Sequence, residues 1–142
     1  YNYIKKNTNN QLSGGNTMGN KVFEVCKKYS DDLIKFTQEL VKTRSYSDEE
    51  GDMVEKVINK MNELGYDEAF VDSTGNIVGK VGNGEKIIMF DSHMDTVKVP
   101  NPDEWSYPPF EGKIVDNKLY GRGSVDMKGG LASSVYSAAI AK

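Results

Sequence analysis

Four consecutive apolar residues, Ile87-Ile88-Met89-Phe90, restrict the folds that are open to this chain. They lie within residues 86–91, and polar and apolar side chains do not alternate there. A strand of this kind is buried on both faces, as it is in the centre of an α/β sheet. We therefore predict a central sheet strand over residues 86–91, in a fold of the α/β class.

Two amphipathic helices are predicted ahead of this strand. Over residues 21–42 the apolar side chains recur every three or four positions, which is the spacing of one helix face. A second stripe of the same kind covers residues 53–64, and Gly65 follows it in the position of a C-terminal cap. Ser47 and Glu50 have the spacing of a capping box, so we expect them to open this second helix.

Two β-hairpins and a last helix complete the predicted elements. Short strands are expected at residues 68–72 and 76–81, and again at 113–115 and 118–120, each pair around a turn sequence. Small side chains in residues 131–142 suit a helix that packs closely on a sheet. This helix stops at Lys142 without a cap or a breaker, so the chain is expected to be truncated there.

The composition excludes several classes of protein. A net charge of −3 gives no basic surface, so nucleic acid is not an expected partner. The single cysteine, Cys26, excludes a disulfide framework and a zinc site built from thiolates. No apolar run is long enough to span a bilayer, and no signal-peptide pattern is present. We expect a soluble, cytoplasmic protein without membrane contacts.

Residues 1–17 are rich in Asn, Gly, Ser and Lys and have too few apolar side chains to bury. We expect this leader to be disordered. Met18 opens the first periodic segment, so it is a candidate for the native start, with residues 18–142 as the folded part. A natural polar leader, or the remnant of a tag, remains an equal alternative.

His93, the only histidine, follows the predicted central strand, and Asp95 comes two residues later. In extended backbone this spacing projects both side chains to the same side. Ligands of open α/β sheets bind beyond the carboxyl ends of the strands. A neutral imidazole is a common zinc ligand, and a neighbouring carboxylate orients it. A histidine that merely forms a hydrogen bond with Asp95 is the structural alternative, which this short pattern alone favours.

A second polar cluster runs through Gly121-Arg122-Gly123-Ser124-Val125-Asp126. It is similar to a dinucleotide-binding fingerprint, but Asp126 stands where the third glycine would be, and its charge would repel a pyrophosphate. A carboxylate there suits a cation, and its two oxygens could bridge two metal ions about 3.5–4 Å apart. A loop aspartate that caps the next helix is the structural alternative.

Together the two clusters resemble the zinc aminoacylase and carboxypeptidase family of metallopeptidases. This family includes acetylornithine deacetylase, succinyl-diaminopimelate desuccinylase, glutamate carboxypeptidase and related dipeptidases. The matching segments are residues 92–97 and 119–130, with Trp105 and Pro108-Pro109-Phe110 in a loop between them. The resemblance covers nearly everything after Met18. It implies the N-terminal part of a three-layer, zinc-exopeptidase-like catalytic domain with a mixed central sheet.

The resemblance also implies roles for individual residues. His93 would be a ligand of one metal, Asp126 would bridge two, and Asp95, which we count as catalytic, would be the partner of His93. The peptide bond between Asp126 and Met127 would be cis. The family's Glu-Glu pair, a further acidic ligand, a last histidine and an inserted lid domain have no counterpart in this sequence. We therefore expect an incomplete catalytic domain.

By this resemblance the complete enzyme hydrolyses amide bonds of peptides or N-acyl amino acids with two zinc ions, which cobalt or manganese could replace. The complete protein could be a homodimer, and the isolated fragment is expected to be inactive. A non-catalytic metal-binding or interaction module on the same scaffold is the main alternative. A nucleotide-binding α/β domain is disfavoured by Asp126 and by the lack of a phosphate-binding loop.

Overall fold

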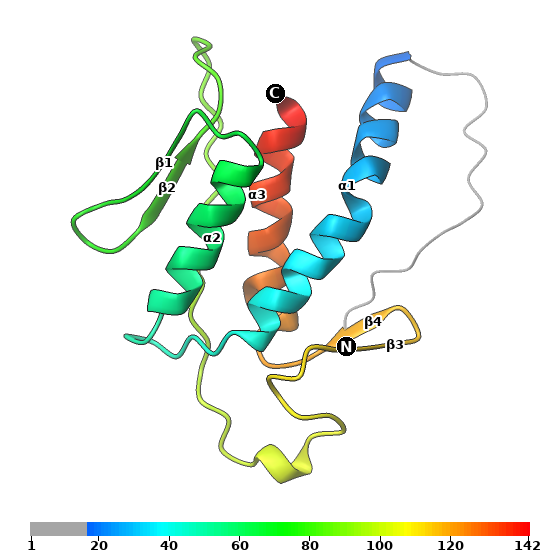
Figure 1. Ribbon diagram of the computed structural model, residues 1–142, viewed down its shortest axis with the longest axis vertical. Coiled ribbons are helices and arrows are strands. Elements are labelled where there is room, and N and C mark those ends of the chain that lie inside the picture. Colours follow the sequence, from blue (N-terminus) through cyan, green and yellow to red (C-terminus); the bar gives the residue numbers. More distant parts are fainter. Residues whose placement is uncertain (1–16) are drawn as a thin grey trace.

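The computed structural model describes residues 17–142, with side chains from residue 19 onward. The leader of residues 1–17 lies outside this range except at Thr17, where the first helix begins. Three α-helices, two hairpins and the loops between them, one of which holds a short 3₁₀ helix at Pro102–Glu104, form the described part (Figure 1). The main elements are α1 (Thr17–Lys42), α2 (Gly51–Glu63), β1 (Glu68–Val71), β2 (Ile77–Lys80), β3 (Lys113–Val115), β4 (Lys118–Tyr120) and α3 (Gly129–Ala141).

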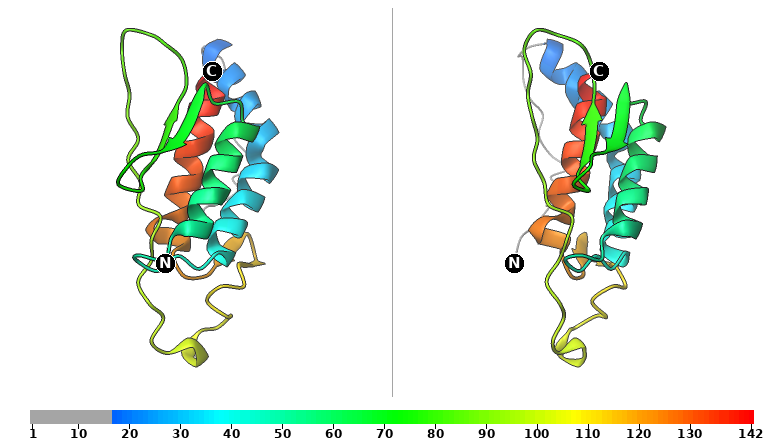
Figure 2. Two further views of the ribbon diagram at one scale, coloured as in Figure 1. Left: turned by 60° about the vertical axis from the view of Figure 1, so that its left-hand side comes forward. Right: turned by 90° about the vertical axis from the view of Figure 1, so that its left-hand side faces the viewer.

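The three helices run side by side and enclose the hydrophobic core (Figures 1 and 2). Buried side chains recur at helical spacing, as the sequence pattern predicted. No helix of the described range is long and apolar enough to cross a membrane. The core residues are Phe36, Leu40, Met53, Val57, Met61, Leu131, Ala132, Val135 and Tyr136.

Both predicted hairpins are confirmed. β1 pairs antiparallel with β2, with Glu68 opposite Lys80, and β3 pairs antiparallel with β4, with Lys113 opposite Tyr120. Within residues 17–142 they form two separate two-stranded sheets. The β1–β2 hairpin lies beside α2, whereas the β3–β4 hairpin lies at the end of the helices where α1 finishes (Figure 1). The mixture of helices and strands confirms the α/β class.

The predicted central strand is wrong for the described part of the chain. Residues 86–91 form no strand, and the side chains of Ile87, Ile88 and Met89 are 90%, 82% and 84% exposed. Figure 2 shows this segment as an extended stretch along the length of the helices. A strand forms only where a neighbour pairs with its backbone groups, and no strand in residues 17–142 lies alongside this one. The mixed central sheet is therefore not formed by these residues.

The predicted capping box is also wrong. The N-cap of α2 is Glu50, which makes no side-chain capping bond, and the helix begins at Gly51. The reason lies at Asp48, whose φ of 71° is left-handed, so a helix cannot start directly after Ser47. The other end of α2 follows the prediction, because Gly65 has a φ of 75° just after the last turn.

Candidate metal centre

The loop after α1 fixes the segment that carries His93. Tyr46 and Thr96 form an isolated parallel bridge, in which the Thr96 amide donates to the Ser45 carbonyl at 2.7 Å. The Ser45 hydroxyl, which is fully buried, donates to the Met94 carbonyl at 2.8 Å. Residues 94–96 are thus held by main-chain and side-chain bonds from a loop some fifty positions earlier.

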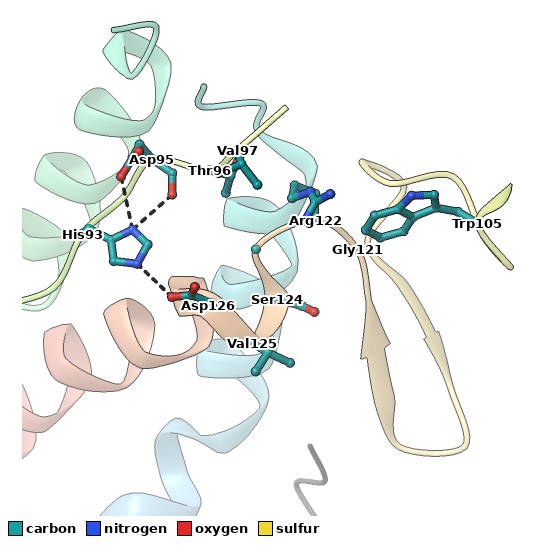
Figure 3. Close-up of a pocket in the computed structure, with 11 residues that line it drawn as sticks. His93, Asp95, Thr96, Val97, Trp105, Gly121, Arg122, Ser124, Val125 and Asp126 are labelled. Atoms are coloured by element: carbon teal, nitrogen blue, oxygen red, sulfur yellow. Dashed lines mark hydrogen bonds and ion pairs between the residues drawn. The ribbon is translucent and has the colours of Figure 1, made fainter. Parts of the chain in front are cut away.

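Asp126 lies in an irregular turn, Ser124–Lys128, directly before α3. Gly123 precedes the turn with a φ of 77°, and its carbonyl accepts a hydrogen bond from the Lys128 amide at 2.9 Å. The peptide bond between Asp126 and Met127 is cis, which confirms that prediction. The turn places the Asp126 carboxylate on the side where His93 lies (Figure 3).

The three predicted site residues converge, as expected (Figure 3). His93 Nε2 lies 2.9 Å from Asp126 Oδ1, and His93 Nδ1 lies 3.2 Å from both Oδ1 and the carbonyl oxygen of Asp95. The imidazole therefore has one carboxylate at each nitrogen. The prediction that these side chains meet beyond the carboxyl end of a central strand is wrong, because residues 86–91 form no strand.

Hydrogen bonding shifts the pKa of two of these groups. The bond to Asp126 raises the pKa of His93 above its usual value, although partial burial acts in the opposite direction. The hydroxyl of Ser47 donates to Asp95 Oδ2 at 2.7 Å, and this bond lowers the pKa of Asp95. The first effect favours a protonated imidazole. The second favours an ionised Asp95 beside the ring, which is the form that can orient a histidine ligand.

These side chains line an open cavity of about 290 Å³. Its other side is formed by Trp105 and Arg122, whose guanidinium carbon lies 5.0 Å from the centre of the indole ring. Arg122 is the only lysine or arginine among the lining residues, and its Nε is buried without a hydrogen-bond partner in residues 17–142. The cavity thus has carboxylates at one end and a guanidinium at the other.

The chemistry of the donors fits a metal ion, but the donor set is partial. A metal ion would replace the proton between His93 Nε2 and the Asp126 carboxylate, while Nδ1 keeps its own proton directed at Asp95. The described residues contain no group of three or more His, Cys, Asp and Glu side chains that could hold a metal. Structural and catalytic zinc sites take at least three protein ligands.

Sequence reasoning missed the contacts of two residues, one bound to Asp95 and one two positions after Asp126. Ser47 was assigned to a helix cap, but its hydroxyl bonds to Asp95. Lys128 is fully buried, its Nζ donates to the Thr43 carbonyl at 2.6 Å just past the end of α1, and burial lowers its pKa to about 8. Two glycines follow Lys128 in the sequence, and they were the one local signal that the chain could pack closely here.

Comparisons with known proteins show which family this chain resembles. Residues 89–142 match the sequence model of Peptidase family M20/M25/M40. The uncharacterized protein YgeY of Escherichia coli strain K12 is 35% identical over 121 residues, which cover 85% of this chain and 30% of that protein. A probable succinyl-diaminopimelate desuccinylase of Staphylococcus epidermidis is 36% identical over 107 residues, which cover 73% of this chain and 26% of that protein. The chain thus spans less than a third of these curated relatives.

Proposed function

Because this chain belongs to Peptidase family M20/M25/M40, we propose that it is part of a hydrolase that uses two metal ions to cleave amide bonds. The observation that carries the proposal is the arrangement around His93. One ring nitrogen faces the Asp126 carboxylate at 2.9 Å, and the other faces Asp95. This is the pattern of a histidine ligand with a second carboxylate that orients it.

Each residue has a distinct task in this proposal. His93 Nε2 and the Asp126 carboxylate would hold metal, and the carboxylate of Asp126 is mostly exposed. Asp95 accepts the Nδ1 proton of His93, which fixes the tautomer and makes Nε2 a stronger donor. The chemistry that bound zinc, cobalt or manganese supplies is polarisation of the substrate carbonyl and activation of water.

We further propose that residues 18–142 are the N-terminal part of a larger catalytic domain. Residues outside this range would provide the remaining metal ligands and the glutamate that serves as general base. Two observations support this: only two donors face each other within residues 17–142, and Ile87-Ile88-Met89-Phe90 lies exposed. Homodimer formation and a cytoplasmic location stay predictions for the complete protein.

The proposed substrates are peptides or N-acyl amino acids. A carboxylate on such a substrate would complement the Arg122 guanidinium, which has no ion pair in the described part of the chain. The cavity would then receive the amide near His93 and Asp126 and the substrate charge near Arg122. The name of the Staphylococcus epidermidis relative, a probable desuccinylase, supports an N-acyl substrate.

Metal removal and restoration in the complete protein tests this function. The protein is treated with a chelator and then assayed on dipeptides and N-acyl amino acids, before and after addition of zinc, cobalt or manganese. We expect hydrolysis to disappear and return with metal, and Asp126→Ala to abolish it. Glu55→Gln, on the exposed face of α2, is the matched control and should leave the rate unchanged.

The same assay separates the non-catalytic alternative. Stoichiometric zinc binding without hydrolysis of any of these substrates would favour a metal-binding or interaction module. Full activity in the chelated protein would contradict the proposed chemistry.

A further inference from the structure

The loop between α1 and α2 reaches the metal centre through one side chain. Ser47 Oγ donates to Asp95 Oδ2 at 2.7 Å, while Asp95 Oδ1 faces His93 Nδ1 at 3.2 Å. Each oxygen of this carboxylate therefore has its own partner. A connected row of bonds runs from the hydroxyl of Ser47 through Asp95 and His93 to Asp126.

The backbone around Ser47 explains why its hydroxyl faces Asp95. The bridge between Tyr46 and Thr96 places the two segments next to each other. The left-handed Asp48 then turns the chain, and the Glu49 amide closes this turn on the Tyr46 carbonyl at 2.8 Å. Ser47 is thus placed by its own loop, and α2 begins four residues later.

We propose that Ser47 is a positioning residue of the metal centre. The terminal torsion of an aspartate is broad, so an unrestrained Asp95 carboxylate would sample many orientations. The bond from Ser47 selects the orientation in which Oδ1 accepts the Nδ1 proton of His93. This fixes the tautomer that presents the Nε2 lone pair to a metal shared with Asp126. The inference rests on the proposed function.

A purely structural role belongs to a different serine in the same loop. Ser45 is buried and holds residues 94–96 in place: its hydroxyl donates to the Met94 carbonyl, and its own carbonyl accepts from the Thr96 amide. Ser47 is exposed, and within residues 17–142 its side chain has no hydrogen bond other than the one to Asp95. Loss of the Ser47 hydroxyl should therefore alter the centre and leave the fold intact. Ser47 also lies outside residues 89–142, which match the family's sequence model.

The test compares Ser47→Ala, Ser47→Thr and the wild type in the complete protein. Zinc affinity is measured by competition with a chelating dye, and the His93 tautomer by ¹⁵N NMR of the metal-free protein, with His93→Gln used to assign the signal. We expect Ser47→Ala to weaken zinc binding about tenfold or more, as loss of such outer partners does, and to shift the tautomer. Ser47→Thr, which keeps the hydroxyl, should bind zinc within about threefold of wild type, and the melting temperature should not change in either variant.

Three outcomes would overturn the inference. The first is Ser47→Ala with wild-type zinc affinity and an unchanged His93 tautomer. The second is a loss of zinc affinity in Ser47→Ala that Ser47→Thr does not restore, together with a lower melting temperature. This result would indicate a structural role for Ser47. The third is a wild type that binds no zinc, which contradicts the proposed function as well. The first two outcomes leave the proposed function intact.

Discussion

At the scale of single residues, a glycine lets the two halves of the candidate site come together. A Cβ atom on Gly123 would lie 2.6 Å from Thr96 Cγ2 and 3.3 Å from Lys128 Cδ. The segment that carries His93 and the turn that carries Asp126 touch at this point. Any side chain here would separate the two groups that the proposed function needs close together.

Gly123→Ala should therefore disturb both stability and metal binding. The left-handed φ of 77° strains an alanine, and the added methyl must also displace Thr96. We expect a loss of about 1–3 kcal/mol from overpacking in addition to the backbone strain, together with weaker zinc binding. Gly75→Ala is the matched control, because its φ is 91° but no atom lies within 4 Å of the added carbon. An equal decrease in the free energy of unfolding of the two variants, measured with urea, would contradict this account.

Lys128 gives a prediction about pH. Burial lowers its pKa from 10.5 to about 8, so between these pH values the unfolded chain binds more protons at this residue than the folded chain. The free energy of unfolding should therefore rise as the pH increases from 8 to 10.5, by an amount on the order of 3 kcal/mol. Below pH 8 both states are protonated, and the residue contributes no pH dependence.

The comparison variant is Lys128→Met, which keeps a long apolar stem without a titrating group. Urea unfolding at several pH values should show the rise in the wild type and not in Lys128→Met, while other titrating groups contribute equally to both. Parallel pH profiles for the two proteins would show that Lys128 is not buried in its folded state.

At the scale of elements, the contact between α1 and α3 depends on a buried tyrosine. The ring of Tyr136 packs edge-on against Tyr29, and its hydroxyl donates to the Asp32 carboxylate on α1. Burial and this bond raise the pKa of Tyr136. The bond is the polar contact that orients two otherwise apolar helix faces.

Tyr136→Phe should lower the free energy of unfolding by about 1–2 kcal/mol, because a hydrogen bond to a charged group is lost while Asp32 stays half-exposed to water. A double-mutant cycle with Asp32→Asn isolates the pair. Asp32→Asn should lower the free energy of unfolding more in the wild type than in Tyr136→Phe. The same cost in both backgrounds would mean that the pair does not stabilise the fold.

Among the elements, those that depend on local sequence signals could be predicted and those that depend on distant partners could not. The helices and hairpins depend on local periodicity and turn residues, and both signals are present in the chain. The strand at residues 86–91 depends on partners that residues 17–142 do not provide. The capping box failed because the backbone of Asp48 is left-handed, which the pattern of Ser47 and Glu50 does not encode. His93, Asp95 and Asp126 were singled out because their residue types suit metal binding, and the structure brings them together. Ser47 was missed because a serine has no such distinctive chemistry.

At the scale of the whole molecule, the proposal of a larger catalytic domain makes a prediction about the exposed run at residues 87–90. Residues beyond this chain would pair with the segment and cover its apolar side chains. Amide hydrogen exchange of residues 87–90 in the complete protein should therefore be slower by orders of magnitude than exchange in the neighbouring turn at residues 83–85. Fast exchange throughout residues 83–90 would contradict the assignment of this chain to part of a larger sheet domain.

The central claim is that His93 and Asp126 share a metal ion. Anomalous diffraction at the zinc absorption edge, from crystals of the zinc-loaded complete protein, tests it most directly. The account predicts a zinc peak about 2.0–2.2 Å from both His93 Nε2 and an Asp126 carboxylate oxygen, with Asp95 bound to His93 Nδ1 and not to the metal. A fully occupied zinc site that excludes either His93 or Asp126 would contradict it.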